Sequence, residues 1–258
     1  MSAFKVNIVL FGIGNVGSTL INQVLASQKF FIEKRNIDLR FPIITNSTLA
    51  FFEKEGAQNQ WEANFAQSAI PFRVSDIIKY VQEEELENLI FVDATASLAL
   101  VESYPELIEN GFNIVAANKK ANTLDLDFYQ QLRTLLNVHE KSFLYETNVG
   151  AGLPIIDTLK HLIASGDKIN KINAVLSGSL NFIFNNFDEN SSFEEVVKEA
   201  GVQGFTEPDP KIDLSGVDVA RKILILIRES GYQMDIEEIE NNCFLPKECM
   251  ETTNNADF

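Results

Sequence analysis

Acidic and basic side chains gather in the stretch GFTEPDPKIDLSGVDVARK, residues 204–222, immediately before five consecutive apolar residues. Asp218 and Lys222 are four residues apart, so they share one face of any helix that forms there. Such a helix, starting near Leu214 with Asp213 as its N-cap, would be apolar on every side and therefore buried. An ordinary surface ion pair fits poorly on a buried helix. The pattern predicts a polar active site inside an apolar wall.

This group of residues suits the transfer of a proton beside a hydride transfer. The Lys222 ammonium could give a proton to, or take one from, an oxygen whose carbon gains or loses a hydride. Glu207 stands on a loop that Pro208 and Pro210 hold extended, and it could bind a cationic group of the substrate. We therefore take Lys222, Asp218 and Glu207 as candidate catalytic residues.

A nicotinamide dinucleotide can carry the hydride, and the stretch KVNIVLFGIGNVGSTLINQVL has the features of a site for one. An apolar run from Val6 to Phe11 predicts a strand, and the spacing after it predicts a helix. Gly12, Gly14 and Gly17 form GxGxxG between the two, with Asn15 and Val16 inside the motif. In this context the motif indicates a pyrophosphate-binding turn. The alternative is a strand-to-helix turn that holds no ligand.

The end of the next predicted strand, DLRFPIITN, bears on the choice of cofactor. Pro42 suggests that this strand lies at an edge or contains a bulge. An NAD site usually places Asp or Glu at the end of this strand, whereas Thr45, Asn46 and Ser47 stand here. These neutral groups tolerate a 2′-phosphate better than a carboxylate would, which favours NADP or the use of both NADP and NAD. Alternatively, they cap the following helix.

Two further strand ends should reach the same crevice, because ligands of open α/β sheets bind outside the carboxyl ends of the strands. The buried strand in NLIFVDATAS places Ala94, Thr95 and Ala96 there. The strand in GFNIVAANKKANT ends near Lys119, which could point into the crevice or could be a solvated surface lysine.

This alternation of strands and helices predicts an α/β fold. Residues 1–148 should form a Rossmann-like, doubly wound parallel sheet that binds the dinucleotide. Residues 149–258 should form an α+β domain for substrate binding, catalysis and dimerisation. The stretches FFEKEGAQNQWEANFAQ and VQEEELEN read as insertions or solvated helix faces.

The second domain opens with glycines and a helix from about Leu153, with apolar spacing at Ile156, Leu159 and Ile163. Glu146, just before that turn, could join exposed carbonyls in holding a cation, although simple helix entry explains the pattern as well. The segment 172–176 predicts a strand of a separate sheet, which would suit a dimer interface.

Composition limits the partners. The formal net charge of −16 repels nucleic acid and anionic membranes, so a small-molecule substrate is expected. No apolar run approaches the length of a membrane span and no signal-like segment opens the chain, which predicts a cytoplasmic protein. Cys243 and Cys249 match neither a zinc nor a redox spacing and are expected to be reduced thiols.

Five motifs together resemble the homoserine dehydrogenase family, in that family's order and over most of the chain. The likeness is closest to the dehydrogenase half of bifunctional aspartokinase–homoserine dehydrogenases. The motifs are GIGNVG at 12–17, NKKANT at 118–123, NVGAGLPII at 148–156, LSGSL at 176–180 and TEPDPKIDLSGVDVARK at 206–222.

The resemblance implies interconversion of L-aspartate 4-semialdehyde and L-homoserine with NAD(P)H, in the biosynthesis of threonine and methionine. It implies that Lys222 is the general acid in the reducing direction. It also implies that Glu207 and Asp218 bind the substrate and that Lys119 serves both cofactor and substrate.

The family also binds a monovalent cation such as sodium near ETNVGAGL. Carried over to this sequence, its ligands would be Glu146 and the backbone carbonyls of Val149, Ala151 and Leu153. The role of this cation would be structural.

The family's chain normally continues beyond the point where this sequence ends, with further strands of a dimer sheet. We therefore expect a homodimer if the fold is complete, and an inactive truncated chain is an alternative. A non-catalytic dinucleotide-binding module is another. Aspartate-semialdehyde dehydrogenase, which needs a cysteine nucleophile, fits less well because Cys243 and Cys249 have no paired histidine.

Overall fold

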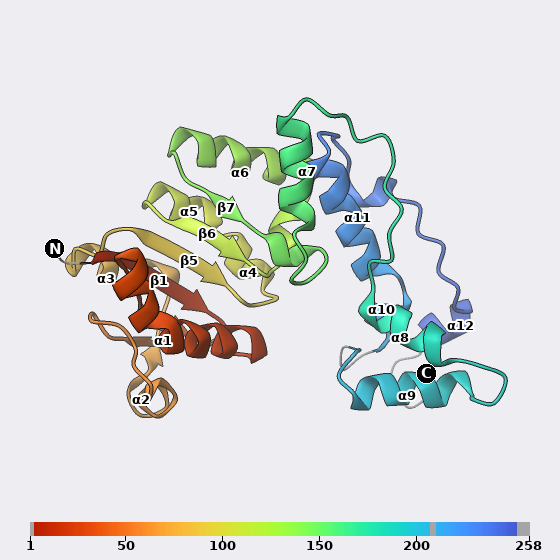
Figure 1. Ribbon diagram of the computed structural model, residues 1–258, viewed down its shortest axis with the longest axis horizontal. Helices are drawn as coiled ribbons and strands as arrows, with labels where there is room; N and C mark the ends of the chain where they lie inside the picture. Colours follow the sequence, from red (N-terminus) through yellow and green to blue (C-terminus); the bar gives the residue numbers. More distant parts are fainter. Residues whose placement is uncertain (1–2, 207–209, 252–258) are drawn as a thin grey trace. The chain divides into compact units, whose positions relative to one another are not determined.

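The computed structural model describes residues 3–206 and 210–251 (Figure 1), so the candidate Glu207 lies outside the described residues. The chain divides into two compact units. Unit 1 runs through Ala121 and resumes over Asp127–Asn148, and unit 2 comprises Asn122–Leu126 and the residues from Val149 onward. The short segment 122–126 thus belongs with unit 2, although the sequence places it inside the first predicted domain.

Unit 1 is built on a seven-stranded sheet with the strand order β4-β3-β2-β1-β5-β6-β7. The strands are β1 Phe4–Phe11, β2 Ile37–Thr45, β3 Leu49–Phe52, β4 Ile70–Pro71, β5 Leu89–Asp93, β6 Asn113–Ala116 and β7 Phe143–Leu144. The pairs β1–β2, β1–β5, β5–β6 and β6–β7 are parallel, whereas β3 is antiparallel to both of its neighbours. The predicted doubly wound α/β sheet is confirmed, with one antiparallel strand that the sequence did not indicate.

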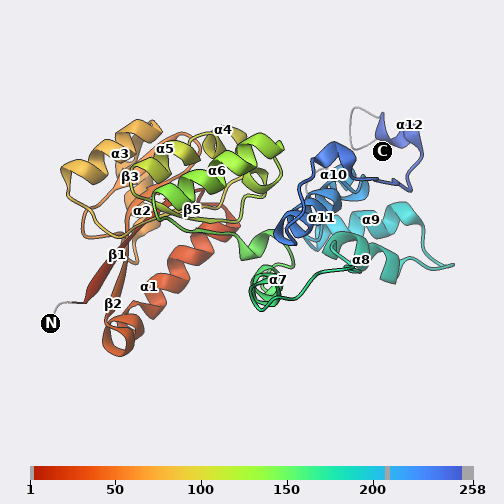
Figure 2. The same ribbon diagram turned by 90° about the horizontal axis from the view of Figure 1, so that it is seen from above.

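Helices cover both faces of this sheet. Figure 2 shows α1 on one face and α3, α5 and α6 on the other. The helices of unit 1 are α1 Asn15–Arg35, α2 Trp61–Ser68, α3 Val74–Glu83, α4 Leu98–Val101, α5 Tyr104–Glu109 and α6 Leu126–Val138, with the short 3₁₀ helices η1 Lys120–Asn122 and η2 Glu146–Asn148 at its boundary segments.

Burial on both faces explains why the central strands are continuously apolar. Successive side chains of a strand point to opposite faces. Ile8 and Leu10 of β1 accordingly join the core beneath α1. Phe11 lies with its ring 4.9 Å from that of Phe91 on β5, which in turn is 5.4 Å from the ring of Tyr104 on α5.

The stretch read as an insertion or solvated helix face is exposed over most of its residues, but Phe51, Trp61 and Phe65 within it belong to the core, which the interpretation missed. It forms β3 and α2, and the side chains of Trp61 and Phe65 are buried in the cluster that contains Ile21 of α1. The indole Nε1 of Trp61 donates a hydrogen bond of 2.9 Å to Asn22 Oδ1. The aromatic residues of this stretch were the signal, because solvated helix faces rarely carry tryptophan.

Pro42 marks a bulge, as one of the two readings of the sequence predicted. The β1–β2 pairing shifts register between Asn7, opposite Arg40, and Val9, opposite Ile43. The other reading, an edge strand, is wrong, because β2 lies between β1 and β3.

Unit 2 is helical over its described residues. Its elements are α7 Ile155–Ala164, α8 Gly178–Asn186, α9 Phe193–Val202, α10 Pro210–Leu214, α11 Val217–Glu229, η3 Ile236–Glu238 and α12 Lys247–Met250. A small apolar core joins α8, α9 and α10 through Ile183, Val196 and Leu214. No helix in the described part of the chain combines the length and apolarity that a membrane crossing requires.

A buried arginine connects α11 to the segment 122–126 within unit 2. The side chain of Arg228 on α11 is 1% exposed. Its Nη1 donates to the carbonyls of Asn122 and Leu124 at 3.0 and 2.9 Å. Its Nη2 donates to the carbonyl of Met234 and pairs with Asp235 Oδ1 at 3.1 Å. Each of these acceptors offsets part of the cost of burying the guanidinium.

Two elements of unit 2 differ from the sequence predictions. The expected strand over 172–176 is irregular and exposed, because the described part of unit 2 contains no strand with which it could pair. The helix expected from Leu214 instead begins at Val217, after Gly216 with φ of 77°. Gly216 interrupts the chain between α10 and α11, so Asp213 belongs to α10 and does not cap α11.

Candidate active site

The turn between β1 and α1 carries three glycines in different environments. Gly12 has φ of 95°, which favours glycine, and its N–H donates to the Thr45 carbonyl at 2.9 Å. A Cβ on Gly17 would lie 1.8 Å from the Gly12 carbonyl oxygen, so only glycine fits there. A Cβ on Gly14, the N-cap of α1, would meet no atom within 4 Å. The turn is therefore tight around Gly12 and Gly17 and open beside Gly14, as a bound pyrophosphate requires.

A pocket of about 550 Å³ opens over this turn at the carboxyl ends of β1, β2 and β5. Five of the predicted cofactor residues are among those that line it: Gly12, Gly14, Asn46, Ser47 and Thr95. Both the size and the position at the strand ends suit part of a dinucleotide.

The other predicted cofactor residues are not among those that line this pocket. Thr45 is fully buried and supports the turn through its carbonyl, so its side chain does not face a ligand. Asn15 and Val16 are exposed in the first turn of α1. After β5, Ala94 is half-buried and Ala96 is exposed, and after β6, Lys119 is half-buried.

One wall of this pocket was not predicted from the sequence. Phe72, Arg73 and Val74 line it from the junction of β4 and α3. The junction reaches the pocket because β3 and β4 extend the sheet beyond β2. Its location depends on the pairing of two short strands, which no local pattern in the sequence indicates.

A buried carboxylate, also missed, connects the loop after β5 to the loop after β6. Asp93 is fully buried and accepts three hydrogen bonds, from Thr95 N at 2.7 Å, Tyr104 Oη at 2.7 Å and Asn118 Nδ2 at 2.9 Å. Burial, and then the Asp93 carboxylate, raise the pKa of Tyr104 well above its ordinary value. Asn118 Oδ1 in turn accepts from Lys120 N at 3.1 Å. Asp93 thereby fixes both the pocket residue Thr95 and the backbone on either side of Lys119.

We expect Asp93→Asn to lower the free energy of unfolding by about 2–3 kcal/mol, because an amide would turn a donor towards another buried donor. Denaturation followed by the fluorescence of Trp61, the single tryptophan and part of the unit 1 core, measures this. Tyr104→Phe is the matched control, since it removes one donor and should cost about 1 kcal/mol. A loss below about 0.5 kcal/mol for Asp93→Asn would show that the network contributes little.

In unit 2 the predicted pair forms. Lys222 Nζ lies 2.6 Å from Asp218 Oδ2 and donates to the carbonyl of Leu176 at 2.8 Å. The two side chains are 15% and 25% exposed, whereas the i,i+4 pair of Lys198 and Glu194 on α9 is more than 70% exposed on both sides. The Lys222 ammonium is thus held in a largely desolvated position by a carboxylate and a carbonyl.

The loop beside this pair is also organised by hydrogen bonds. Ser179 Oγ lies 2.7 Å from both Asp213 Oδ1 and the carbonyl of Phe205. Asn241 Nδ2 donates to the carbonyl of Ser215 at 2.9 Å. These contacts hold Asp213 of α10 and Ser215 after it, just before the start of α11, the helix that carries Lys222.

The predicted cation ligands divide between the units, with Glu146 in unit 1 and Val149, Ala151 and Leu153 in unit 2. Gly150 and Ala151 both have left-handed backbone, with φ of 80° and 53°, so this loop takes an unusual path. The Leu153 carbonyl accepts a hydrogen bond of 2.9 Å from Ile155 N. Within the described residues, no cluster of three His, Cys, Asp or Glu side chains could hold a metal.

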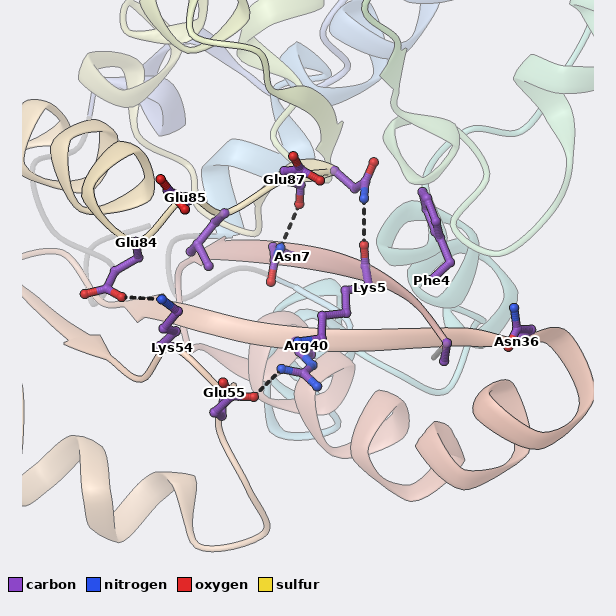
Figure 3. Close-up of a pocket in the computed structure, with 13 residues that line it drawn as sticks. Phe4, Lys5, Asn7, Asn36, Arg40, Lys54, Glu55, Glu84, Glu85 and Glu87 are labelled. Carbon is purple, nitrogen blue, oxygen red and sulfur yellow. Dashed lines mark hydrogen bonds and ion pairs between the residues drawn. The ribbon is translucent and has the colours of Figure 1, made fainter. Parts of the chain in front are cut away.

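A second pocket in unit 1, of about 510 Å³, lies at the amino end of β1 (Figure 3). Two of its cations are engaged in ion pairs, Arg40 with Glu55 at 2.5 Å and Lys54 with Glu84 at 2.8 Å, and its lining also includes the acidic residues Glu85 and Glu87. The hydrogen bond from Arg40 lowers the pKa of the Glu55 carboxyl. The pocket at the carboxyl ends of the strands is therefore the better candidate for a cofactor.

Comparison with known families decides which family this chain represents. Residues 12–146 match the family model described as homoserine dehydrogenase, NAD binding domain, and residues 154–255 match that of homoserine dehydrogenase. The chain belongs to the homoserine dehydrogenase family. The two matches lie on either side of the boundary between the predicted domains.

Curated members of the homoserine dehydrogenase family are similar to most of this chain. It is 42% identical over 242 residues to a bifunctional aspartokinase/homoserine dehydrogenase of Buchnera aphidicola subsp. Acyrthosiphon pisum, covering 93% of the chain and 30% of the relative. It is 40% identical over 243 residues to one of Haemophilus influenzae, covering 94% and 30%. The chain thus spans about a third of the length of these relatives.

Solved structures share the fold of this homoserine dehydrogenase family member. A protein of unknown function from Candida auris matches 98% of the chain and 71% of its own length, with a TM-score of 0.85 and 29% identity. A hyperthermophilic archaeal homoserine dehydrogenase in complex with NADPH matches 92% and 76%, with a TM-score of 0.73 and 25% identity.

Proposed function

We propose that the protein is a homoserine dehydrogenase, which interconverts L-aspartate 4-semialdehyde and L-homoserine with NAD(P)H. The observation that carries the proposal is the Asp218–Lys222 pair at 2.6 Å, whose ammonium is largely desolvated. An ion pair on the protein surface would contribute little to stability, so stability alone does not explain why this pair is shielded from solvent. A pair that is only 15% and 25% exposed, in a chain of this family that also has a dinucleotide pocket, is the arrangement expected of a proton donor.

Lys222 supplies the proton for reduction of the aldehyde. The pocket over the glycine turn would hold a reduced nicotinamide dinucleotide, which would supply the hydride for the aldehyde carbon. The former carbonyl oxygen takes a proton from Lys222 Nζ, and the resulting amine regains a proton from water. Asp218 and the Leu176 carbonyl orient Nζ for this step.

Other residues would bind the reactants. Glu207 would pair with the substrate's ammonium group, and Lys119 would serve the region shared by cofactor and substrate. Gly12, Gly14, Asn46, Ser47 and Thr95 support binding of NADP or NAD, because they line the pocket over the glycine turn.

A monovalent cation such as sodium near the segment from Glu146 to Leu153 is part of the proposal. Its donors would be the Glu146 carboxylate and the carbonyls of Val149, Ala151 and Leu153, so a single negative charge faces the ion. The left-handed backbone at Gly150 and Ala151 is compatible with carbonyls that turn towards one point. Such a cation would stabilise the loop and take no part in the reaction.

A homodimer in the cytoplasm completes the proposal. The segment 172–176 is mostly apolar but has no strand partner in the described part of unit 2, and Val175 is 78% exposed. A second copy could supply a partner by strand pairing. Sedimentation at several concentrations measures the oligomeric state, and a monomer throughout would contradict this part.

The direct test is oxidation of NADPH and of NADH by this chain with L-aspartate 4-semialdehyde, followed by the absorbance of the reduced nicotinamide. Turnover is the expected result, and the two rates rank the cofactors. Dinucleotide binding without turnover would instead identify the chain as a binding module or an incomplete enzyme.

Binding distinguishes an enzyme site from a bare nucleotide sensor. We expect L-homoserine to raise the melting temperature only when a dinucleotide is present, because the substrate should bind to the complex of protein and dinucleotide. A sensor would ignore the amino acid. Aspartate-semialdehyde dehydrogenase activity would instead require phosphate-dependent oxidation that a cysteine-blocking reagent abolishes.

A further inference from the structure

The dinucleotide pocket has an electrostatic character opposite to that of the whole chain. The formal net charge is −16, yet among the described residues that line the pocket none is acidic and the single charged one is Arg73. The cofactor carries negative charge in its pyrophosphate and, in NADP, in a 2′-phosphate as well. A local cation is needed to offset repulsion by an acidic protein.

The groups at the end of β2 leave room for a phosphate. Asn46 Oδ1 accepts from the backbone N–H groups of Thr48 and Leu49 at 2.9 and 2.7 Å, so this oxygen is engaged in its own loop. The neighbouring Ser47 is exposed at the pocket. Both residues can therefore offer donors, and neither places a carboxylate where NAD-specific sites hold the ribose 2′-hydroxyl.

The backbone of Arg73 is held by a hydrogen bond, whereas its guanidinium has no ion-pair partner among the described residues. Its N–H donates to Asp76 Oδ2 at 2.8 Å, which caps α3 and sets the position of Arg73 at the pocket wall. Within the described part of the chain, no carboxylate forms an ion pair with its guanidinium. Arg40, by contrast, is held by Asp38 and Glu55.

We infer that Arg73 binds the 2′-phosphate of NADP, together with donors from Asn46 and Ser47, and so sets a preference for NADP over NAD. The inference rests on the proposed use of a dinucleotide in this pocket. A guanidinium suits this role because its planar fork can donate two hydrogen bonds to one phosphate. Arg73 is thus a specificity-determining residue that acts on the ribose and has no part in the chemical step.

The test compares two fragments of the cofactor that differ by the 2′-phosphate alone. Calorimetric titration of the parent should show tighter binding of 2′,5′-ADP than of 5′-AMP. Arg73→Ala should weaken 2′,5′-ADP by about 10–100-fold and leave 5′-AMP within about twofold. The fluorescence of bound NADPH and NADH should show the same selective loss. Lys79→Ala is the matched control, because Lys79 lies on α3, which directly follows Arg73, and pairs with Glu83 in solvent.

Each other outcome has a distinct meaning. An equal loss for both fragments, or no loss for either, would overturn the role of Arg73. Failure of the parent to bind either fragment would overturn the dinucleotide pocket and the inference with it. Absence of turnover with the selective loss intact would overturn the proposed dehydrogenase activity but leave Arg73 as the 2′-phosphate ligand. Unfolding curves from Trp61 verify that the variants are folded.

Discussion

Replacing Lys222 by alanine is expected to lower turnover by about 10²–10⁴-fold, the range for loss of a positioned general acid. Dinucleotide affinity should stay within about twofold, because Lys222 belongs to unit 2 and the glycine turn with its pocket belongs to unit 1. Steady-state rates of NADPH oxidation give the first quantity, and the fluorescence of bound NADPH gives the second. Unchanged turnover would remove Lys222 from the mechanism.

Two further variants separate proton transfer from the loss of a charge. Lys222→Arg keeps a cation that can still pair with Asp218, but a guanidinium cannot release a proton near neutral pH, so turnover should remain low. Lys198→Ala removes a lysine of the same i,i+4 type from an exposed pair and should leave turnover unchanged. Recovery of activity in the arginine variant would indicate that charge alone matters.

The second large effect is expected at Gly17. In Gly17→Ala, the new methyl group would lie 1.8 Å from the Gly12 carbonyl, so α1 or the turn must shift. We expect a loss of about 3 kcal/mol or more in the free energy of unfolding, the upper range for overpacking, together with loss of dinucleotide binding. Denaturation followed by Trp61 fluorescence and titration with NADPH measure the two effects.

Gly14→Ala provides the matched comparison in the same motif. Its methyl group would meet no protein atom within 4 Å and its φ of −70° suits alanine, so stability should be retained. The same methyl group would occupy the space beside the helix N-terminus, and dinucleotide affinity should fall by about tenfold or more. Equal destabilisation by the two substitutions would contradict the division of roles between these glycines.

Local sequence patterns predicted the parts of the fold that depend on neighbouring residues. The glycine turn could be read because its spacing follows from one turn of backbone, and the strand ending at Asp93 because both its faces are buried. The pair at Asp218 and Lys222 followed from helical periodicity alone. The helix was predicted to be buried on every side, but the pair is only partly buried and the helix, which begins at Val217, keeps a half-exposed face.

The missed features depend on contacts between residues far apart in the sequence. Arg73 reaches the pocket only because β3 and β4 extend the sheet beyond β2, and Asp93 acquires its role from Asn118, 25 residues later. The error over 172–176 has the same origin. An alternating segment can be a strand only where another strand offers hydrogen bonds, and the sequence does not show whether one is near.

The environment of Arg228 limits how such proteins can exchange parts during evolution. A recombination event at the junction of Asn148 and Val149 would transfer most of unit 2 but leave behind residues 122–126, whose carbonyls receive the buried guanidinium. The new combination would keep Arg228 well satisfied only if the recipient offered a segment of the same backbone path. An exchange of unit 2 should therefore preserve these hydrogen bonds most readily when residues 122–126 are exchanged with it.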